Sequence, residues 1–473
     1  MASEKYWQGF LPYGLAALLI GLVGGFSTVL GPAFMADMGL PYGNTTWTAL
    51  AQAMSTAAWA PVLGKLGDVV GRKRALVLGI LVYGLGNVLT ALAGSLSFML
   101  LARFIVGIGT AAISPVILAY IVAEFPPEKT GKGFSTYMLI SSASVIFGPT
   151  VGSWLIGTFG WRAMVWLCCL LCGLTLPPCL LLGEKPERTR QRAKNHFDSV
   201  GAGLVVVFFS LVLCLPAFGQ NFGWGSRPFL LAALVGALSL IGLVLAEQQA
   251  ENPILPSRFM KRSVFILSVA ALFLTQGLMQ ANMTNTMVFV SYTQPGNTMV
   301  SGYAISVMYL GMSLGAVLLG PLADRFSPKG ALVGSLLVTG LGCGSLLLFS
   351  ENTPSWLLMA SLGLLGLGLG GNSTIFLKTA LDGLAPEEAG TGTGTYGLFR
   401  DLAAPFGVAV FVPLFNNQAE SLQRLGAAPG QAAVGAMAFL ALGEIICVCT
   451  AIALVCFLPH RAKRKEKNDD SEG

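Results

Sequence analysis

The sequence predicts an all-α integral membrane protein with about fourteen membrane-spanning helices. Only 11% of its 473 residues are charged and 54% are hydrophobic, whereas a soluble globular protein carries roughly 25% charged residues. Apolar runs of about 20 residues, the length that a helix needs to cross the hydrocarbon core, recur along the whole chain. Positive charges gather in alternate connections between these runs. We therefore expect lipid to surround much of the molecule.

The apolar runs can be placed in order along the chain. The expected spans cover residues 10–34, 47–63, 75–94, 97–122, 134–156, 162–182, 200–218, 229–247, 264–288, 301–322, 330–349, 355–377, 394–414 and 435–458. Several are rich in glycine, which membrane helices use for close packing. The first run is longer than the apolar core of a signal peptide, so we expect no cleaved leader.

Lysine and arginine follow the even-numbered spans. Arg72–Arg74 follows the second span, Lys129 and Lys132 follow the fourth, and a basic stretch at 185–194 follows the sixth. The positive-inside rule then places these connections and both termini in the cytoplasm. We expect a multi-pass protein of the cell membrane, in a bacterium the inner membrane. Because the basic residues mark topology, the net charge of +6 does not indicate a nucleic-acid partner.

Cysteines and histidines give no sign of a metal or redox site. All nine cysteines fall within apolar runs, and Cys169 and Cys172 have CxxC spacing, but His196 and His460 lie in basic segments away from them. A zinc or redox site needs further ligands at suitable spacing. The sequence also lacks the GxxxxGK[ST] phosphate loop. We therefore expect no metal, no cofactor and no enzymatic activity.

A weak internal repeat divides the spans into two sets. GKLGD leaves the second span and ends at Asp68, and GPLAD leaves the tenth and ends at Asp324; 81 residues separate Asp68 from Pro149 and Asp324 from Pro405. Duplicated halves are typical of secondary transporters. We expect a six-helix half at 1–182, cytoplasmic linkers with two inserted spans at 183–262, a second six-helix half at 263–458 and a basic cytoplasmic tail at 459–473.

Three motifs carry a resemblance to a known family. Residues 64–74 read GKLGDVVGRKR, residues 101–109 read LARFIVGIG, and residues 144–153 read SVIFGPTVGS. They resemble the cytoplasmic loop motif, the span 4 motif and the span 5 antiporter motif of the major facilitator superfamily, with departures at Val69 and Val106 and at both ends of the third motif. Together with Trp161-Arg162, the chain resembles the fourteen-span drug:proton antiporter branch. The resemblance implies the major facilitator fold, two six-helix bundles plus two inserted helices.

The resemblance also implies roles for the motif residues. The loop motif implies a conformational latch at Gly64, Asp68, Gly71, Arg72 and Asp324, and the alternative is that these residues only fix topology. The antiporter motif implies a role in export for Gly148, Pro149 and Gly152. Proline removes a backbone hydrogen bond and kinks the helix, so a pure packing role is the alternative for this motif.

Ionisable residues within spans cost roughly 2.5–3.5 kcal/mol on insertion scales and are functional candidates. Arg103, Asp401 and Glu444 are the candidates for proton coupling. Arg103 matches the family position associated with proton transfer, and a hydrogen-bonding hub is its alternative. Asp401 either accepts a proton or neutralises Arg400, and a structural role is the alternative for Glu444. The acidic residue that the family branch usually carries in span 1 is missing from Gly24–Thr28, which weakens the case for coupling.

One face of the ninth span carries neutral polar groups. Gln276, Gln280 and Thr284 recur at i, i+4 and i+8 and so share a helical face, and we expect Asn372 in the twelfth span to face the same space. The resemblance places the ninth span on a central cavity. Hydrogen-bonding groups in an otherwise apolar cavity suit an amphipathic organic molecule, while hydrogen bonding between helices is the alternative.

These observations lead to an expected function. We expect a monomeric secondary active transporter that exports hydrophobic or amphipathic small molecules in exchange for protons by alternating access, as in multidrug efflux. The alternative is an uptake symporter or facilitator for an organic anion such as a bile or carboxylic acid. The expected partners are the small-molecule substrate, protons and the lipid bilayer.

Overall fold

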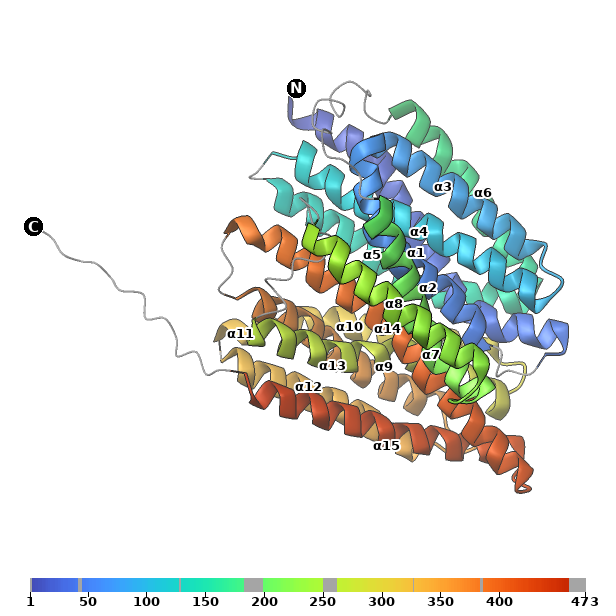
Figure 1. The fold of residues 1–473 in the computed structure, drawn as a ribbon. Helices are drawn as coiled ribbons and strands as arrows, with labels where there is room; N and C mark the ends of the chain where they lie inside the picture. The colour runs from blue at the N-terminus through green and yellow to red at the C-terminus, as the bar shows by residue number, and fades with distance from the viewer. Residues whose placement is uncertain are drawn as a thin grey trace, which may run out of the picture.

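The computed structural model describes residues 2–40, 45–126, 129–182, 199–249, 262–325, 327–382 and 386–458. Within these ranges the chain is helical apart from short connections, and it forms no β-strand (Figure 1). The all-α prediction is confirmed. Of the linkers expected within 183–262, residues 183–198 and 250–261 lie outside the described residues, as does the expected tail at 459–473.

The helices of the first part of the chain are α1 (Ala2–Met38), α2 (Thr45–Val70), α3 (Arg72–Ala91), α4 (Leu96–Glu124), α5 (Thr130–Phe159) and α6 (Trp161–Leu182). Two further helices follow, α7 (Ser199–Phe222) and α8 (Arg227–Gln249). The second part holds α9 (Ser263–Thr293), α10 (Thr298–Leu318), the short α11 (Leu322–Arg325), α12 (Pro328–Ser345) with a 3₁₀ turn at Leu346–Leu348, α13 (Ser355–Leu381), α14 (Pro386–Arg424) and α15 (Pro429–Cys456).

Twelve of the described helices are long and apolar enough to cross a membrane. The helices α2 and α7 are not among the twelve, although they are 26 and 24 residues long. The sequence of α2 is less apolar because Thr48, Gln52 and Thr56 lie within it. A multi-pass membrane fold is therefore established, and the count of fourteen spans is not confirmed.

The same helix pairing occurs in both parts of the chain. In the first part α1 packs along α5, α2 along α4, and α3 along α4 and α6. In the second part α9 packs along α14, α10 along α13, and α12 along α13 and α15. The boundaries that we predicted for the two six-helix halves remain a prediction, and "first half" and "second half" below denote α1–α6 and α9–α15.

Glycines permit the closest helix crossings. A Cβ atom at Gly25 would lie 2.6 Å from the Cα of Gly148, and a Cβ at Gly277 would lie 3.2 Å from the Cα of Gly407. The first contact joins α1 to α5 and the second joins α9 to α14. Small residues at such contacts let helix backbones approach one another in membrane proteins.

The two halves meet chiefly through two pairs of helices, α5 with α10 and α2 with α14. Between α5 and α10 the hydroxyls of Thr150 and Ser306 hydrogen-bond at 2.8 Å, and between α2 and α14 Leu50 packs against Ala409. The start of α1 and the end of α15 lie at the same end of the bundle (Figure 1). Because α5 runs away from that end and α10 runs back toward it, the Thr150–Ser306 contact lies in the part of the bundle farther from the termini.

The pair α7 and α8 lies against the boundary between the halves. The helices pack against each other, and α7 also packs against α2 of the first half and α14 of the second. An apolar cluster connects α7 to α2 and α14, and it includes Ala57, Val205, Phe209 and Leu402. The inserted pair therefore covers the boundary between α2 and α14.

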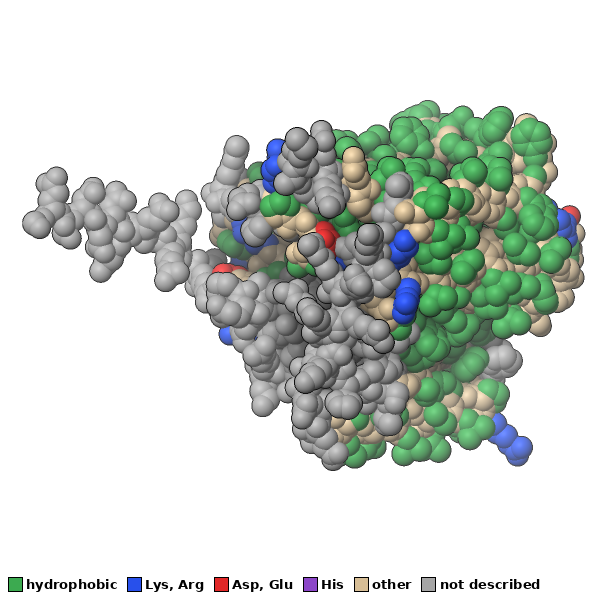
Figure 2. Space-filling model, turned by 90° about the horizontal axis from the view of Figure 1, so that it is seen from above, with side chains coloured by type: hydrophobic (Ala, Val, Ile, Leu, Met, Phe, Trp, Pro, Cys, Tyr) green, Lys and Arg blue, Asp and Glu red, His purple; other side chains and the backbone are tan. Residues whose placement is uncertain are grey.

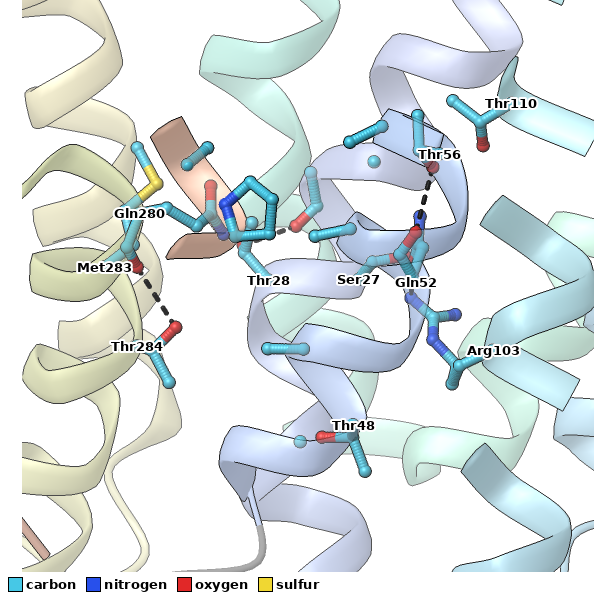
Figure 3. A pocket seen from close by; sticks show the side chains of 18 of the residues that line it. Ser27, Thr28, Thr48, Gln52, Thr56, Arg103, Thr110, Gln280, Met283 and Thr284 are labelled. Atoms are coloured by element: carbon cyan, nitrogen blue, oxygen red, sulfur yellow. Dashed lines mark hydrogen bonds between the residues drawn. The ribbon is translucent and has the colours of Figure 1, made fainter. Parts of the chain in front are cut away.

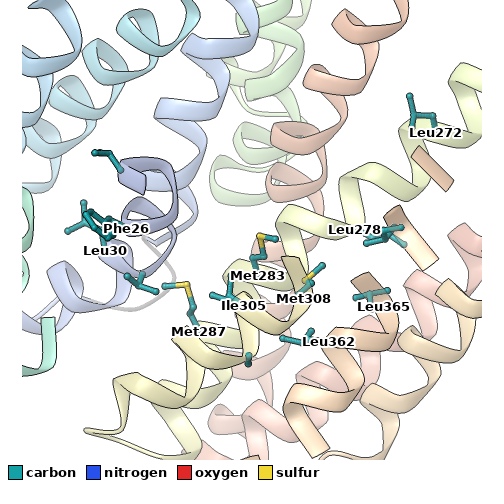
Figure 4. Packing of buried hydrophobic residues seen from close by; sticks show 14 of the residues in the cluster. Phe26, Leu30, Leu272, Leu278, Met283, Met287, Ile305, Met308, Leu362 and Leu365 are labelled. Carbon is teal, nitrogen blue, oxygen red and sulfur yellow. The ribbon is translucent and has the colours of Figure 1, made fainter. Parts of the chain in front are cut away.

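Apolar side chains fill the interior and also cover much of the surface. Buried leucine, isoleucine and methionine side chains of the second half pack between α9, α10 and α13, among them Met283, Ile305 and Leu362 (Figure 4). The surface in Figure 2 is largely hydrophobic, and the coloured charged side chains gather toward its ends. Exposed leucines such as Leu234 and Leu238 on α8 belong on a surface that contacts lipid tails.

Candidate functional site

A cavity of about 470 Å³ lies between the two halves. Side chains from α1, α2, α4 and α5 form one wall, and side chains from α9, α10 and α14 form the other. Most of the exposed area of the wall is apolar, and polar side chains from both halves interrupt it. Sites for small organic molecules typically have about this volume, roughly 300–1,000 Å³, and this composition.

The α2–α4 wall is built around a buried arginine. Arg103 of α4 is 4% exposed, and its Nη2 donates a hydrogen bond to Oε1 of Gln52 on α2 (Figure 3). Thr56, one turn from Gln52, donates from Oγ1 to the carbonyl oxygen of Gly107 at 3.1 Å. These two bonds tie α2 to α4 and hold the guanidinium at the cavity, and no described carboxylate forms an ion pair with it.

The α1 wall carries hydroxyls but no acid. Ser27 and Thr28 line the cavity together with Gly24 and Gly25. The hydroxyl of Ser27 donates to the carbonyl of Val23 at 2.8 Å, and that of Thr28 donates to the carbonyl of Gly25 at 2.6 Å. The stretch of span 1 where the family branch usually carries its acid is thus part of the wall.

The α9 wall is the polar face that the sequence predicts. Gln276, Gln280 and Thr284 all line the cavity, and Met279 and Met283 lie between them. Figure 3 shows Gln280, Met283 and Thr284 across the space from α2 and α4. Methionine side chains are flexible and polarisable, so they adapt to apolar molecules of different shapes.

Arg400 and Asp401 of α14 also face the cavity. Nε and Nη2 of Arg400 both lie 2.9 Å from Oδ1 of Asp401. The side chains are 45% and 50% exposed. Each charge therefore has its counter-charge on the neighbouring residue while both remain accessible.

Asn372 is not on the cavity, and that prediction is wrong. Its side chain is 1% exposed, and its Nδ2 donates to Oγ1 of Thr339 on α12 at 2.9 Å. Asn372 lies on the side of α13 that packs against α12, in the interior of the second half. Asn372 thus has the alternative role, hydrogen bonding between helices.

Glu444 also lies away from the cavity, inside the second half. It is completely buried on α15, and its Oε1 accepts a hydrogen bond from Nδ2 of Asn282 on α9 at 2.8 Å. The thiol of Cys343 on α12 lies beside the carboxyl. The helix α9 therefore connects two places, since Gln280 and Thr284 face the cavity while Asn282 faces Glu444.

Several polar atoms around Glu444 are buried without a hydrogen-bond partner. Among the described residues they include Oε2 of Glu444 and Oδ1 of Asn282, and one turn from Asn282 on α9 both polar side-chain atoms of Asn285 are also buried and unpaired. Buried polar atoms are normally paired, and exceptions need an explanation such as a proton, an ion or water. The interior of the second half thus holds unused hydrogen-bonding capacity next to an ionisable group.

The motif of the α2–α3 loop is described in part. Gly71 has a φ of +99°, a conformation that glycine adopts at no steric cost. Arg72 donates to the carbonyl of Ala119 at 3.2 Å and pairs with Glu124 at 3.3 Å, which ties the start of α3 to the end of α4. A Cβ at Gly64 would lie 3.3 Å from Pro115 of α4. The side chains of the predicted latch residues Asp68 and Asp324 lie outside the described residues.

The predicted antiporter motif lies at two helix contacts. Gly148 contacts Gly25 on α1, and a Cβ at Gly152 would lie 2.9 Å from Cγ2 of Val29, also on α1. The carbonyl of Pro149 lies 2.7 Å from where a Cβ of Gly302 on α10 would be. The motif therefore joins α5 to its own half and to the other half.

Sequence reasoning missed the polar face of α2. Thr48, Gln52 and Thr56 recur at i, i+4 and i+8 and all line the cavity. This is the spacing that identified the polar face of α9, so the same search would have found it. The buried charge of Arg103 is a second signal, because such a group needs a polar partner on a neighbouring helix.

Comparisons with known proteins agree with this architecture. The family model of the Major Facilitator Superfamily matches residues 13–408 and again 272–472. The chain is 30% identical over 424 residues to a probable actinorhodin transporter of Streptomyces coelicolor, a match that covers 85% of this chain and 71% of that protein. It is 27% identical to a puromycin resistance protein of Streptomyces alboniger (86% and 81% covered) and 25% identical to Multidrug resistance protein 3 of Bacillus subtilis (81% and 74% covered).

Solved structures share the fold. An auto-inhibited peptide transporter of the POT family superimposes with a TM-score of 0.67 at 14% identity, and the match covers 97% of this chain and 98% of that one. A bacterial homologue of the human lysosomal transporter Spinster gives a TM-score of 0.64 at 13% identity, with 96% of each chain covered. At these identities the likeness concerns the fold alone.

Proposed function

The chain belongs to the Major Facilitator Superfamily, a family of transporters, and from this premise we propose that it exports hydrophobic or amphipathic small molecules by alternating access. The observation that carries the proposal is the cavity of about 470 Å³ between the halves, whose wall is mostly apolar in area and carries uncharged polar side chains from both halves. The names of the resistance proteins that it resembles support drug-type efflux. We propose that it acts as a monomer in the bacterial cell membrane and not as an enzyme.

We propose that both termini are cytoplasmic and that the structure is closed on the opposite side. The basic connections support this orientation through the positive-inside rule. The contacts of Thr150 with Ser306 and of Gly302 with Pro149 join the halves in the part of the bundle farther from the termini. A cavity closed on that side accepts its cargo from the cytoplasm, which is what an exporter requires.

The same orientation assigns a role to the α2–α3 loop. We propose that Gly64, Asp68, Gly71, Arg72 and Asp324 form a latch at the cytoplasmic ends of the halves. Arg72 already anchors α3 to Glu124 of α4. Release of such a latch lets the cavity open to one side of the membrane. Its closure returns the transporter to the state that opens to the other side.

We propose that export is coupled to proton entry through Asp401 and Glu444. Asp401 is on the cavity wall, where protonation would free Arg400 from its ion pair. Glu444 is buried without a described cationic partner, and it holds Asn282 on the helix whose other face lines the cavity. Because a guanidinium keeps its proton, Arg103 acts on coupling only through its charge.

The link through α9 gives the coupling a physical route. Ionisation of Glu444 strengthens its hydrogen bond from Asn282, since charge-assisted bonds are stronger than neutral ones. Protonation weakens that bond and changes the cost of moving α9 relative to α15. A change in the position of α9 moves Gln280 and Thr284 with it.

An uncoupled facilitator is the second candidate. The observation in its favour is the α1 wall, where Gly24, Gly25, Ser27 and Thr28 face the cavity without a carboxyl. A facilitator would equilibrate its substrate and ignore a pH gradient.

Transport in proteoliposomes tests the proposal. The probe is a neutral fluorescent molecule, dansyl amide, and its movement is followed with and without an imposed pH gradient. Coupled export predicts accumulation that a protonophore abolishes, and it predicts that Glu444→Gln and Asp401→Asn each lower pH-driven accumulation about tenfold. Arg424→Gln, an exposed arginine at a helix end, is the matched control. Equilibrating flux that ignores pH would favour the facilitator, and the absence of flux would contradict transport of this class of compound.

A further inference from the structure

The charges on the cavity wall are unequal. The described residues that line the cavity include two arginines, Arg103 and Arg400, and one acid, Asp401. Asp401 is already neutralised, because its Oδ1 lies 2.9 Å from two nitrogens of Arg400. The described wall thus presents one formal positive charge without a protein counter-charge.

That charge belongs to Arg103. Its hydrogen-bond partner among the described residues is the neutral side-chain amide of Gln52. A buried charge that has only a neutral partner keeps a large part of its desolvation cost. An anionic group that enters the cavity relieves this cost, whereas a cation increases it.

The chemistry of the guanidinium specifies the kind of anion. Its planar fork of N–H groups matches the oxygens of a carboxylate or sulfonate, which it can bind in bidentate fashion. The wall also carries apolar side chains, with Leu30, Phe34 and Met99 from the same half as Arg103 and Met283 from the other half. Such surroundings suit a molecule with an apolar body and one anionic group.

We propose that the cavity selects amphipathic organic anions over organic cations, with Arg103 as the residue that binds the anionic group. This inference rests on the proposed export function and specifies its substrate class. Gln52 is a positioning residue, since it holds the guanidinium through Oε1 while Thr56 fixes α2 to α4.

A matched set of probes tests the selection. Three molecules share a naphthalene body and differ in charge: naphthalenesulfonate, naphthalenesulfonamide and a naphthylmethyl trimethylammonium. Their binding to the purified full chain and their transport in proteoliposomes are measured for each variant. The wild-type protein is expected to prefer the sulfonate over the ammonium by about tenfold or more.

Four variants separate the charge from the fold. Arg103→Gln is expected to remove the preference for sulfonate while transport of the neutral sulfonamide continues. Arg103→Lys keeps the charge and is expected to keep the preference, and Gln52→Glu places a carboxylate beside Arg103 and is expected to shift the preference toward the ammonium. Arg424→Gln is the control, since this side chain is 82% exposed at the end of α14. If Arg103→Gln does not fold, as shown by thermal unfolding in detergent, Gln52→Glu and Arg103→Lys still decide the question.

Two outcomes would overturn the inference. One is a wild-type protein that prefers the ammonium or does not distinguish the charges, and the other is a charge preference that Gln52→Glu leaves unchanged. Continued transport of the sulfonamide in either case would leave the proposed export function intact. Loss of all three probes from wild-type transport would contradict both proposals.

Discussion

At the scale of single residues, close packing is set by the absence of side chains at a few positions. Gly25 and Gly148 face each other where α1 crosses α5, and a Cβ on either would lie 2.6 Å from the Cα of the other. The obstructing atoms belong to backbone, so a side-chain rotation cannot relieve the overlap. The neighbouring Gly24 meets nothing within 4 Å, so glycine is required here only at the contact itself.

Gly148→Ala is therefore expected to lower stability. The added methyl group forces α1 and α5 apart, and overpacking of this kind costs about 1–3 kcal/mol. The measurement is thermal unfolding of the purified protein in detergent. Gly173→Ala on α6, where a Cβ meets nothing within 4 Å, is the matched control and is expected to unfold at or above the wild-type temperature. Equal unfolding temperatures for the two variants would contradict this account of the contact.

The cavity residues show what a sequence can predict at this scale. Gln276, Gln280 and Thr284 were found because polar groups four residues apart must share a face of an α-helix. Asn372 has no such periodic partner, and the direction in which it points depends on how α13 crosses α12. The bond from Arg103 to Gln52 joins residues far apart in the sequence, so periodicity alone cannot show it.

At the scale of elements, the contact of α5 with α10 connects the two halves. Gly302 on α10 packs against the carbonyl of Pro149 and the hydroxyl of Ser153, and Thr150 bonds to Ser306 one turn farther along. Helix boundaries and the repeat of helix pairing follow from apolar runs and motif spacing in the sequence. The contact between α5 and α10 does not, because it depends on which conformation of the proposed alternating-access cycle the halves adopt.

Gly302→Ala is expected to shift the balance between these conformations. Its methyl group would meet the Pro149 carbonyl 2.7 Å away, which disfavours the state in which α5 and α10 touch but not the state in which they separate. Hydrogen–deuterium exchange should therefore rise in residues 147–159 and 298–306. Gly296→Ala changes a glycine with φ of +87° in the preceding connection and controls for general loosening. Exchange that rises equally in all helices would indicate lost stability rather than a shifted conformation.

At the scale of the whole molecule, α7 and α8 decide the number of spans. Two inserted spans leave the sidedness of all other connections unchanged, which is why the basic residues predict the same orientation with or without them. Among the described residues α8 is long and apolar enough to cross a membrane, and α7 contains the apolar stretch Gly203–Pro216. The topology of the connection between them is therefore the informative measurement.

Reporter fusions distinguish the two arrangements. If both helices cross the membrane, alkaline phosphatase fused after Gly225 is expected to be active, as it should be after Gly160. A fluorescent protein fused after residue 473 should fluoresce if the C-terminus is cytoplasmic. An inactive phosphatase after Gly225 together with an active one after Gly160 would leave twelve spans. An active phosphatase at the C-terminus would overturn the orientation derived from the positive-inside rule.

The position of α7 and α8 also makes the two sides of the transporter unequal toward the bilayer. On one side the pair stands between the lipid and the contact of α2 with α14, while no described helix of the inserted pair packs against α5 and α10. Amphipathic molecules concentrate in the membrane before they are bound by a protein. We therefore expect a cargo dissolved in the bilayer to reach the cavity past α5 and α10 rather than past α7 and α8, and a photoreactive lipid-soluble probe should label α5 and α10 in preference to α2 and α14.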